Sequence, residues 1–161
     1  MSIAELAPAY IRAISPYQPG KPITQLAREM GIPVDKIVKL ASNENPLGMS
    51  PRARAATQAA MDGIERYPDQ FDLTAALSER FGVGMEQIVL GNGSNDVLDL
   101  VARVFLAPGR SSVFSRHAFA VYPLATQATG AECIETPARS DDYGHDLEAM
   151  LLAIRPDTHL V

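Results

Sequence analysis

Hydrophobic positions from about residue 85 onward alternate between short continuous runs and helical spacing. Short apolar runs indicate buried strands, and apolar residues at steps of three and four indicate the buried face of a helix. The predicted strands cover residues 88–90, 112–115 and 132–136, and a last strand begins at Thr158. The predicted helices between them cover about 97–105, 119–129 and 147–154.

This alternation predicts an α/β fold with a mostly parallel sheet, because strands joined through helices make right-handed crossovers that cover both faces of the sheet. Local signals support the helix ends. Gly130 accommodates the positive φ that closes a helix, Asp146 is placed to cap the next one, and Pro156 stops it. A parallel sheet needs covered edges, so we expect the domain to be cut at Val161.

The first 84 residues do not show this alternation of strands and helices. Up to Gly48 they are rich in proline and loop-like, with a predicted short helix at 24–30 and a strand-like stretch at 37–41. Ser50 followed by Pro51 is typical of a helix start, and this helix is expected to run to Gly63. Another helix, 73–81, is expected to end at Gly82. We therefore predict an N-terminal arm over 1–50 and an incomplete α/β domain over 51–161.

The composition of the chain excludes several classes of function. The 161 residues carry 19 acidic and 14 basic side chains, a net charge of −5, and the basic residues are scattered. Nucleic-acid binding is disfavoured, because it needs a concentrated positive surface. Cys133 is the single cysteine and cannot form an intrachain disulfide. No apolar run reaches the roughly 18 residues of a membrane span. We expect a cytoplasmic protein with no nucleic-acid or membrane partner.

The strongest local motif is GNGSN, residues 91–95, between a predicted strand and a predicted helix. Glycines allow close backbone approach, and the free N–H groups of a first helical turn attract an anion, phosphate above all. A dinucleotide fingerprint would need glycine where Asp96 stands, and no Gly-Lys-Ser/Thr follows for a P-loop. A plain turn in which Ser94 only caps the helix is the competing interpretation.

Four segments in register carry a family resemblance: KLASNENPLG at 39–48, ERYPD at 65–69, GNGSNDVLDLVARVFLAPG at 91–109 and HAFAVYP at 117–123. Together they resemble the histidinol-phosphate aminotransferases, which are fold-type I enzymes dependent on pyridoxal 5'-phosphate. The match extends over nearly the whole chain. It implies the N-terminal arm and the first part of the large domain of the aspartate aminotransferase-like fold, with the C-terminal small domain absent.

The resemblance implies that Gly93, Ser94 and Asn95 bind the cofactor phosphate, where the motif already calls for an anion. It places the ring of Phe119 against the pyridine ring of the cofactor, a stacking that suits two flat rings. Packing in the protein core is the competing interpretation of Phe119.

The resemblance also implies a homodimer with a shared active site, since the hydroxyl of Tyr67 would reach the cofactor phosphate of the neighbouring subunit. Tyr17 and Asn43 would lie near the substrate. Tyr67 before a proline, and the SNENP segment with its turn-forming residues, are also explained as purely structural turns.

No catalytic residue is predicted in this chain. Aminotransfer with this cofactor needs a Schiff-base lysine, and Lys21, Lys36 and Lys39 all lie outside the Ser-x-x-Lys setting that the family uses. The three histidines show no metal-ligand spacing, so no metal site is expected. The DDYG sequence at 141–144 is typical of a solvated turn.

The resemblance implies amino transfer between histidinol phosphate (or imidazole acetol phosphate) and glutamate (or 2-oxoglutarate) in histidine biosynthesis. The chain alone is expected to be inactive. Two alternatives stay open: another fold-type I enzyme, such as a threonine-phosphate decarboxylase or an aromatic aminotransferase, and a non-enzymatic module that binds phosphate or dimerises.

Overall fold

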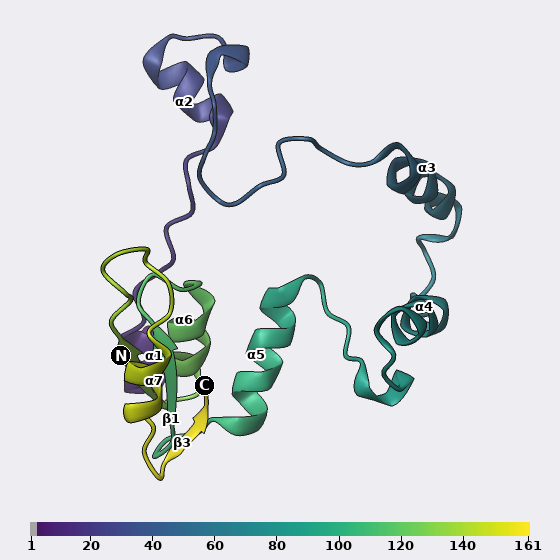
Figure 1. The fold of residues 1–161 in the computed structure, drawn as a ribbon. Helices are drawn as coiled ribbons and strands as arrows, with labels where there is room; N and C mark the ends of the chain where they lie inside the picture. Colours follow the sequence, from purple (N-terminus) through teal and green to yellow (C-terminus); the bar gives the residue numbers. More distant parts are fainter. Residues whose placement is uncertain (1–2) are drawn as a thin grey trace. The chain divides into compact units, whose positions relative to one another are not determined.

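The computed structural model describes residues 3–161 (Figure 1). Their contacts divide the chain into two compact units. One unit joins the described residues up to Tyr17 with Glu86–Val161, and the other is Gln18–Met85. This division differs from the arm and domain that we expect from the sequence, and the boundary at residue 50 stays a prediction. None of the helices in the described part of the chain has the length and apolar character needed to cross a membrane.

The first unit contains the sheet. Its elements in chain order are a 3-10 helix at Ile3–Leu6, α1 (Ala9–Arg12), α5 (Ser94–Phe105), β1 (Ser111–Ser115), α6 (Val121–Ala128), β2 (Glu132–Thr136), α7 (Leu147–Leu152) and β3 (Thr158–Leu160). A further 3-10 helix, Met85–Gln87, lies at the boundary between the units. Each predicted helix of this region is present within a few residues of its expected bounds.

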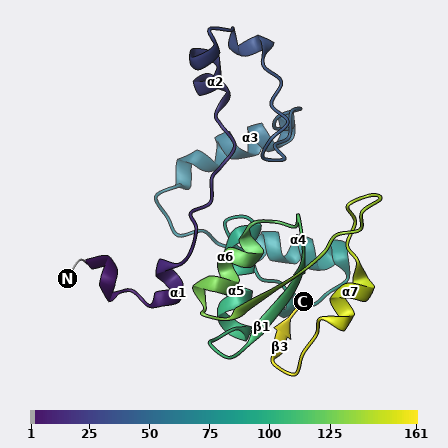
Figure 2. The same ribbon diagram turned by 90° about the vertical axis from the view of Figure 1, so that its left-hand side faces the viewer.

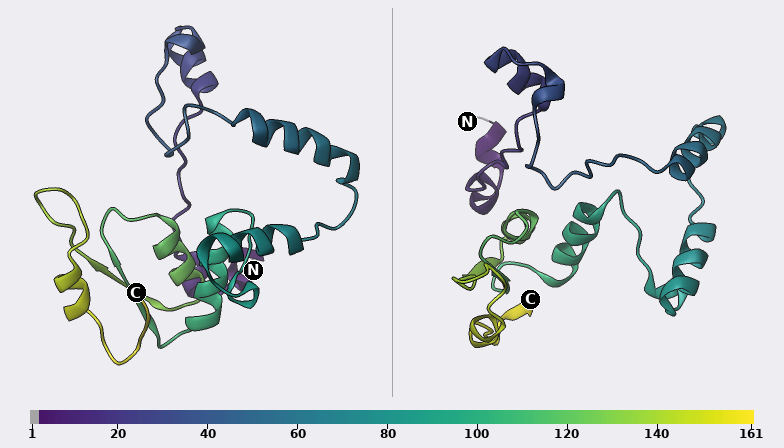
Figure 3. Two further views of the ribbon diagram at one scale, coloured as in Figure 1. Left: turned by 45° about the vertical axis from the view of Figure 1, so that its right-hand side comes forward. Right: turned by 45° about the horizontal axis from the view of Figure 1, so that its top comes forward.

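The sheet has the order β2-β1-β3, and both pairs are parallel. β1 pairs with β2 along its whole length, from Ser111 opposite Glu132 to Ser115 opposite Thr136. From β1 the chain passes through α6 to β2 on one side of it, and then through α7 to β3 on the other side. Because both crossovers are right-handed, α6 and α7 lie on opposite faces of the sheet (Figure 3). The predicted α/β class and parallel sheet are confirmed.

The central strand is buried throughout although three of its five residues are serine. Val113 is 1% exposed and supplies apolar contact. The serine hydroxyls have partners across the interior: Ser111 lies 3.0 Å from the Thr158 hydroxyl and Ser112 lies 2.8 Å from the Thr126 hydroxyl. A buried hydroxyl is tolerated when it is hydrogen-bonded, so these pairs explain how a serine-rich strand occupies the core.

Small side chains let the helices of this unit pack closely. The buried cluster consists of Ala102, Leu106, Ala125 and Ala131, with Val121 and Leu160 packed against it. Ala102 on α5 and Ala125 on α6 both belong to this cluster, so little side-chain volume separates the two helices there. The two helices therefore form one layer, visible side by side in Figure 2.

Two strand predictions are wrong. Residues 88–90 and 37–41 are not in strands. Among the described residues, both neighbours of β1 are taken by β2 and β3, and no further strand pairs with the apolar run at 88–90. A strand exists only through hydrogen bonds to a partner, so a suitable local sequence is not enough.

The second unit is helical. It contains α2 (Ile23–Met30), α3 (Pro51–Ala60) and α4 (Phe71–Phe81), with 3-10 helices at Val34–Lys36 and Met61–Gly63. Its helix ends follow the predicted chemistry: the Ser50 hydroxyl accepts a hydrogen bond from the Ala53 amide at 3.1 Å, and Gly82 ends α4 with φ 65°. α4 begins at Phe71, two residues before its predicted start, because the Asp69 carboxylate accepts a bond from the Phe71 amide.

Candidate functional site

The turn that leads into α5 has a conformation that only glycine adopts readily. Gly93 is the N-cap of the helix, with φ 85° and ψ 175°. A side chain at this φ and ψ is strained. Gly91 is required for a different reason, since a Cβ there would lie 2.9 Å from the Cβ of Asp96. The two glycines therefore shape the backbone at the start of α5.

Asp96 closes this turn. Its Oδ2 accepts hydrogen bonds from both the backbone amide and the side-chain amide of Asn92, at 2.9 and 3.0 Å. This role of Asp96 is not predicted from the sequence, where the residue serves only to exclude a dinucleotide fingerprint. An acidic residue in the third helical position that reaches back across the N-terminus was the available signal.

No described side chain caps the first N–H groups of α5, whereas Ser50 caps α3 and Asp146 caps α7. Ser94 is the first residue of the helix and not its cap, so the competing interpretation of Ser94 as a plain N-cap is wrong. The first turn of α5 therefore presents unclaimed backbone donors together with the positive end of a helix of 12 residues. This geometry suits an anion.

Phe119 follows the carboxyl end of β1, in the turn before α6. Its side chain is partly open, with 45% of the residue exposed, so it is not a core residue. Its ring and that of the neighbouring Tyr122 meet edge to face, with 6.2 Å between the ring centroids and 85° between the ring planes. A half-exposed ring held from one side can accept a second flat group.

The start of α5 and Phe119 belong to the same edge of the sheet. α5 leads into the first residue of β1, and α6 leaves from the last, so both helices run opposite to the strand. Their N-terminal ends therefore lie at the carboxyl edge of the sheet, where open α/β sheets bind ligands. The structure thus brings Gly93, Ser94 and Asn95 to the same edge as Phe119.

The other predicted residues are described within their own units. Tyr17, in the first unit, is exposed. Tyr67 and Asn43 lie in the second unit, and Tyr67 is completely exposed. Asn43 has φ 50° in the SNENP segment, and Glu44 of this segment forms an ion pair of 2.6 Å with Lys39, which precedes it. The three predicted roles in cofactor and substrate binding stay predictions.

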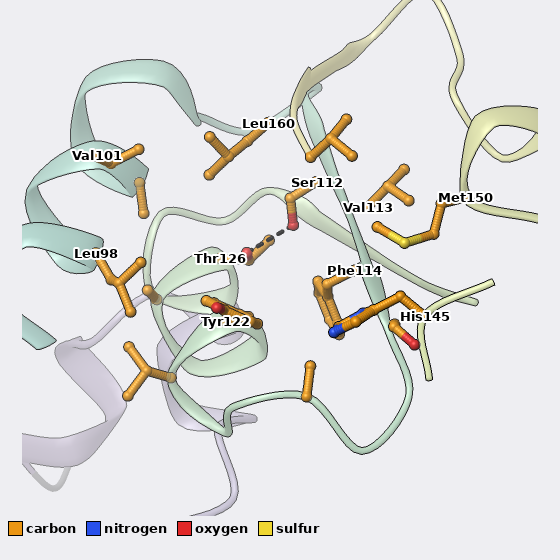
Figure 4. A pocket seen from close by; sticks show the side chains of 16 residues that line it. Leu98, Val101, Ser112, Val113, Phe114, Tyr122, Thr126, His145, Met150 and Leu160 are labelled. Carbon is orange, nitrogen blue, oxygen red and sulfur yellow. Dashed lines mark hydrogen bonds between the residues drawn. The ribbon is translucent and has the colours of Figure 1, made fainter. Parts of the chain in front are cut away.

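A pocket of about 400 Å³ runs along β1 (Figure 4) and reaches its carboxyl end, where Ser115 and Ala118 line it. Residues of α5, α6 and α7 line it, including Leu98, Tyr122 and Met150. None of the predicted site residues is among its lining residues. The pocket opens beside Val113–Ser115, the part of β1 that β3 does not pair with. We interpret it as a gap in apolar packing, since its walls offer little polar chemistry.

Titratable groups elsewhere give no sign of a second reactive centre. Burial raises the pKa of the Cys133 thiol, which keeps it protonated and unreactive. The described residues contain no group of three or more His, Cys, Asp or Glu side chains that could hold a metal ion.

Comparison with known proteins agrees with this geometry. Residues 35–161 match the family model of aminotransferase class I and II. The chain is 76% identical over 161 residues to histidinol-phosphate aminotransferase 1 of Dechloromonas aromatica, and 65% identical over 163 residues to histidinol-phosphate aminotransferase 2 of Nitrosospira multiformis. All of this chain is covered in both comparisons, and it spans 44% and 41% of the length of those proteins.

Solved structures show the same fold. The histidinol-phosphate aminotransferase of Sinorhizobium meliloti, crystallised with pyridoxal-5'-phosphate, superposes with a TM-score of 0.77 over 94% of this chain and 40% of its own, at 23% sequence identity. The fold is therefore that of fold-type I aminotransferases, as the sequence predicts. With its matching family model and its close relatives, the chain belongs to the aminotransferase class I and II family.

Proposed function

We propose that this chain forms the N-terminal part of a histidinol-phosphate aminotransferase that uses pyridoxal 5'-phosphate. The observation that carries the proposal is the uncapped first turn of α5 behind Gly93, which offers an anion site at the carboxyl edge of a parallel sheet. The relative with 76% identity supports the choice of substrate within the family.

The residues at this edge fit the cofactor. The amides of the first turn and the side chains of Ser94 and Asn95 would hold the phosphate. No heavy atom lies within 4 Å of the position that a Cβ on Gly93 would take, so the phosphate has room to approach the backbone there. Phe119 would cover one face of the pyridine ring. When bound, pyridoxal phosphate supplies an electron sink for chemistry at the substrate Cα. The residues of this chain bind and orient it.

The remaining parts of the proposal come from the family. The substrates would be histidinol phosphate (or imidazole acetol phosphate) and glutamate (or 2-oxoglutarate), with Tyr17 and Asn43 near the amino substrate. Tyr67 would complete the cofactor site of a partner subunit in a cytoplasmic homodimer. The three lysines of the chain all lie in Gln18–Met85, outside the Ser-x-x-Lys setting, so we expect the 161 residues alone to have no transaminase activity.

The test is cofactor binding and transamination by the full-length protein. Ser94→Ala removes one donor to a charged group, which is worth about 1.5–3 kcal/mol, so the dissociation constant for pyridoxal phosphate should rise roughly 10- to 150-fold. Ser50→Ala is the matched control, because Ser50 caps α3 and has no predicted contact with the cofactor.

Titration of the apo-protein with pyridoxal phosphate, followed by absorbance, measures both variants. A wild-type protein that binds no pyridoxal phosphate would refute the proposal. Release of carbon dioxide from the amino substrate, in place of transamination, would favour the decarboxylase alternative.

A further inference from the structure

The loop between β2 and α7 is a closed structure. An antiparallel bridge joins Ala138 to His145 at its base. Inside it, the amide of Arg139 donates to the carbonyl of Gly144 at 2.9 Å, and the Arg139 guanidinium pairs with the Asp142 carboxylate. A Cβ at Gly144 would lie 2.5 Å from Nη2 of Arg139, so a larger residue there would displace the guanidinium from its present position. The loop therefore presents its tip in a defined conformation.

Tyr143 at this tip meets His117 from the turn after β1. The two ring centroids lie 5.9 Å apart with the rings at 78°, an edge-to-face contact. Both residues have left-handed backbones, with φ 57° at Tyr143 and φ 64° at His117. Such conformations are uncommon for non-glycine residues, and for a bulky residue such as Tyr143 they need support from the surrounding structure. Tyr143 is 73% exposed, so burial in the core does not hold this conformation; its amide donates to the Arg139 carbonyl at 3.1 Å, and its ring contacts that of His117.

The left-handed backbone of His117 sets the path of the chain to Phe119, two residues later. The amide of Ala118 donates to the carbonyl of Ser115 at 3.2 Å, which turns the chain off the end of β1. The carbonyl of Phe119 then accepts from the amide of Tyr122 at 3.0 Å, and the two rings meet edge to face. A change of φ at His117 would redirect the backbone that carries the Phe119 ring.

We propose that His117 and Tyr143 are positioning residues for Phe119, with their ring contact holding the left-handed turn that fixes where the Phe119 ring stands. The inference rests on the proposed function, in which Phe119 covers the pyridine ring of pyridoxal phosphate. In this proposal both residues act on the cofactor site through the turn that carries Phe119. A loop treated in the sequence as a solvated turn thereby becomes part of the support of the cofactor site.

The experiment uses the full-length protein and Tyr143→Ala. Loss of one aromatic contact should weaken pyridoxal phosphate binding roughly 2- to 10-fold and reduce the circular dichroism of the bound cofactor, which reports a fixed orientation. Tyr143→Phe keeps the ring and should behave as wild type. His117→Asn keeps the tendency toward a left-handed backbone but lacks the ring, and should show a loss no larger than that of Tyr143→Ala.

A double-mutant comparison with Phe119→Ala distinguishes a role of Tyr143 in positioning the Phe119 ring from a role in the stability of the whole domain. In a Phe119→Ala background, Tyr143→Ala should cause no further loss of affinity, because the ring that it positions is gone. Leu152→Ala, on the exposed face of α7, is the control for a surface change near this loop. Thermal unfolding of each apo-protein establishes that the variants are folded.

Two results would overturn this inference alone: wild-type affinity and dichroism in Tyr143→Ala, or the same loss from Tyr143→Ala with and without the Phe119 ring. A wild-type protein that binds no pyridoxal phosphate would instead refute the proposed function, and this inference with it.

Discussion

Replacing Gly93 by alanine tests the turn before α5 most directly. At φ 85° and ψ 175°, Gly93 occupies a region that is essentially reserved for glycine. An added Cβ would meet no heavy atom within 4 Å, so the variant introduces no clash. Its whole effect must come from the backbone, which either remains strained or moves to a conformation that alanine prefers.

The size of the effect follows from this strain. Holding a non-glycine residue in such a region costs of order 1–3 kcal/mol. If the cofactor phosphate requires the present backbone, that energy opposes binding, and the dissociation constant for pyridoxal phosphate should rise roughly 5- to 150-fold. The N–H groups of the first turn would still exist in Gly93→Ala, so a loss of affinity would report the changed backbone conformation and not a missing donor.

Gly109→Ala is the matched control. Gly109 follows α5, has φ 87° and likewise has open space around its absent Cβ. Calorimetry or titration with pyridoxal phosphate gives affinity, and chemical unfolding gives stability, both on the full-length protein. We expect both variants to lose stability and only Gly93→Ala to lose affinity. Equal affinities in the two variants would refute the assignment of the phosphate site to this turn.

Three further predictions concern stability and reactivity. Thr126→Val leaves the buried Ser112 hydroxyl without its 2.8 Å partner, so the free energy of unfolding measured in urea should fall by about 1–3 kcal/mol. Adding Ser112→Ala should restore much of this stability. An unchanged free energy of unfolding in Thr126→Val would contradict the pairing. The Arg139 guanidinium lowers the pKa of Asp142 to about 2, below its unfolded value of about 3.9, so the contribution of this pair is present above pH 4 or so and is lost as the pH falls toward 2. A carboxyl titration by NMR should show this pKa returning toward 3.9 or so in Arg139→Met, and an unchanged value would exclude the ion pair as its cause. Because burial raises the pKa of Cys133, iodoacetamide should alkylate it slowly in the native protein and rapidly in urea; similar rates would show that the thiol is accessible.

Local signals determined helix ends well. Ser50 and Asp146 cap α3 and α7 as predicted, and Gly82 ends α4 in the left-handed conformation. These features involve residues within three or four positions of each other, so the local sequence contains all of the interacting groups. The spacing of apolar residues likewise predicted the helices around the sheet.

The candidate site was predictable in part. GNGSN at a strand-to-helix junction indicated an anion site, and the structure adds an uncapped helix start with Asp96 closing the turn. The contact between His117 and Tyr143 was not predictable, because it depends on the β2-α7 loop returning to the end of β1. Neither the residue types nor their spacing in the sequence indicates this contact.

The sequence by itself determined the α/β class, the parallel strands and most helix boundaries, since these follow from hydrophobic periodicity and from local hydrogen bonding at helix ends. Only the tertiary structure decided which strands exist and which segments share an edge. The run at 88–90 has strand character but no partner among the described residues, whereas serine-rich β1 is the central strand because Thr126 and Thr158 satisfy its buried hydroxyls. Hydrogen bonds between segments that are distant in the sequence decide both which run forms a strand and which strand is central. A local sequence pattern does not contain these hydrogen bonds.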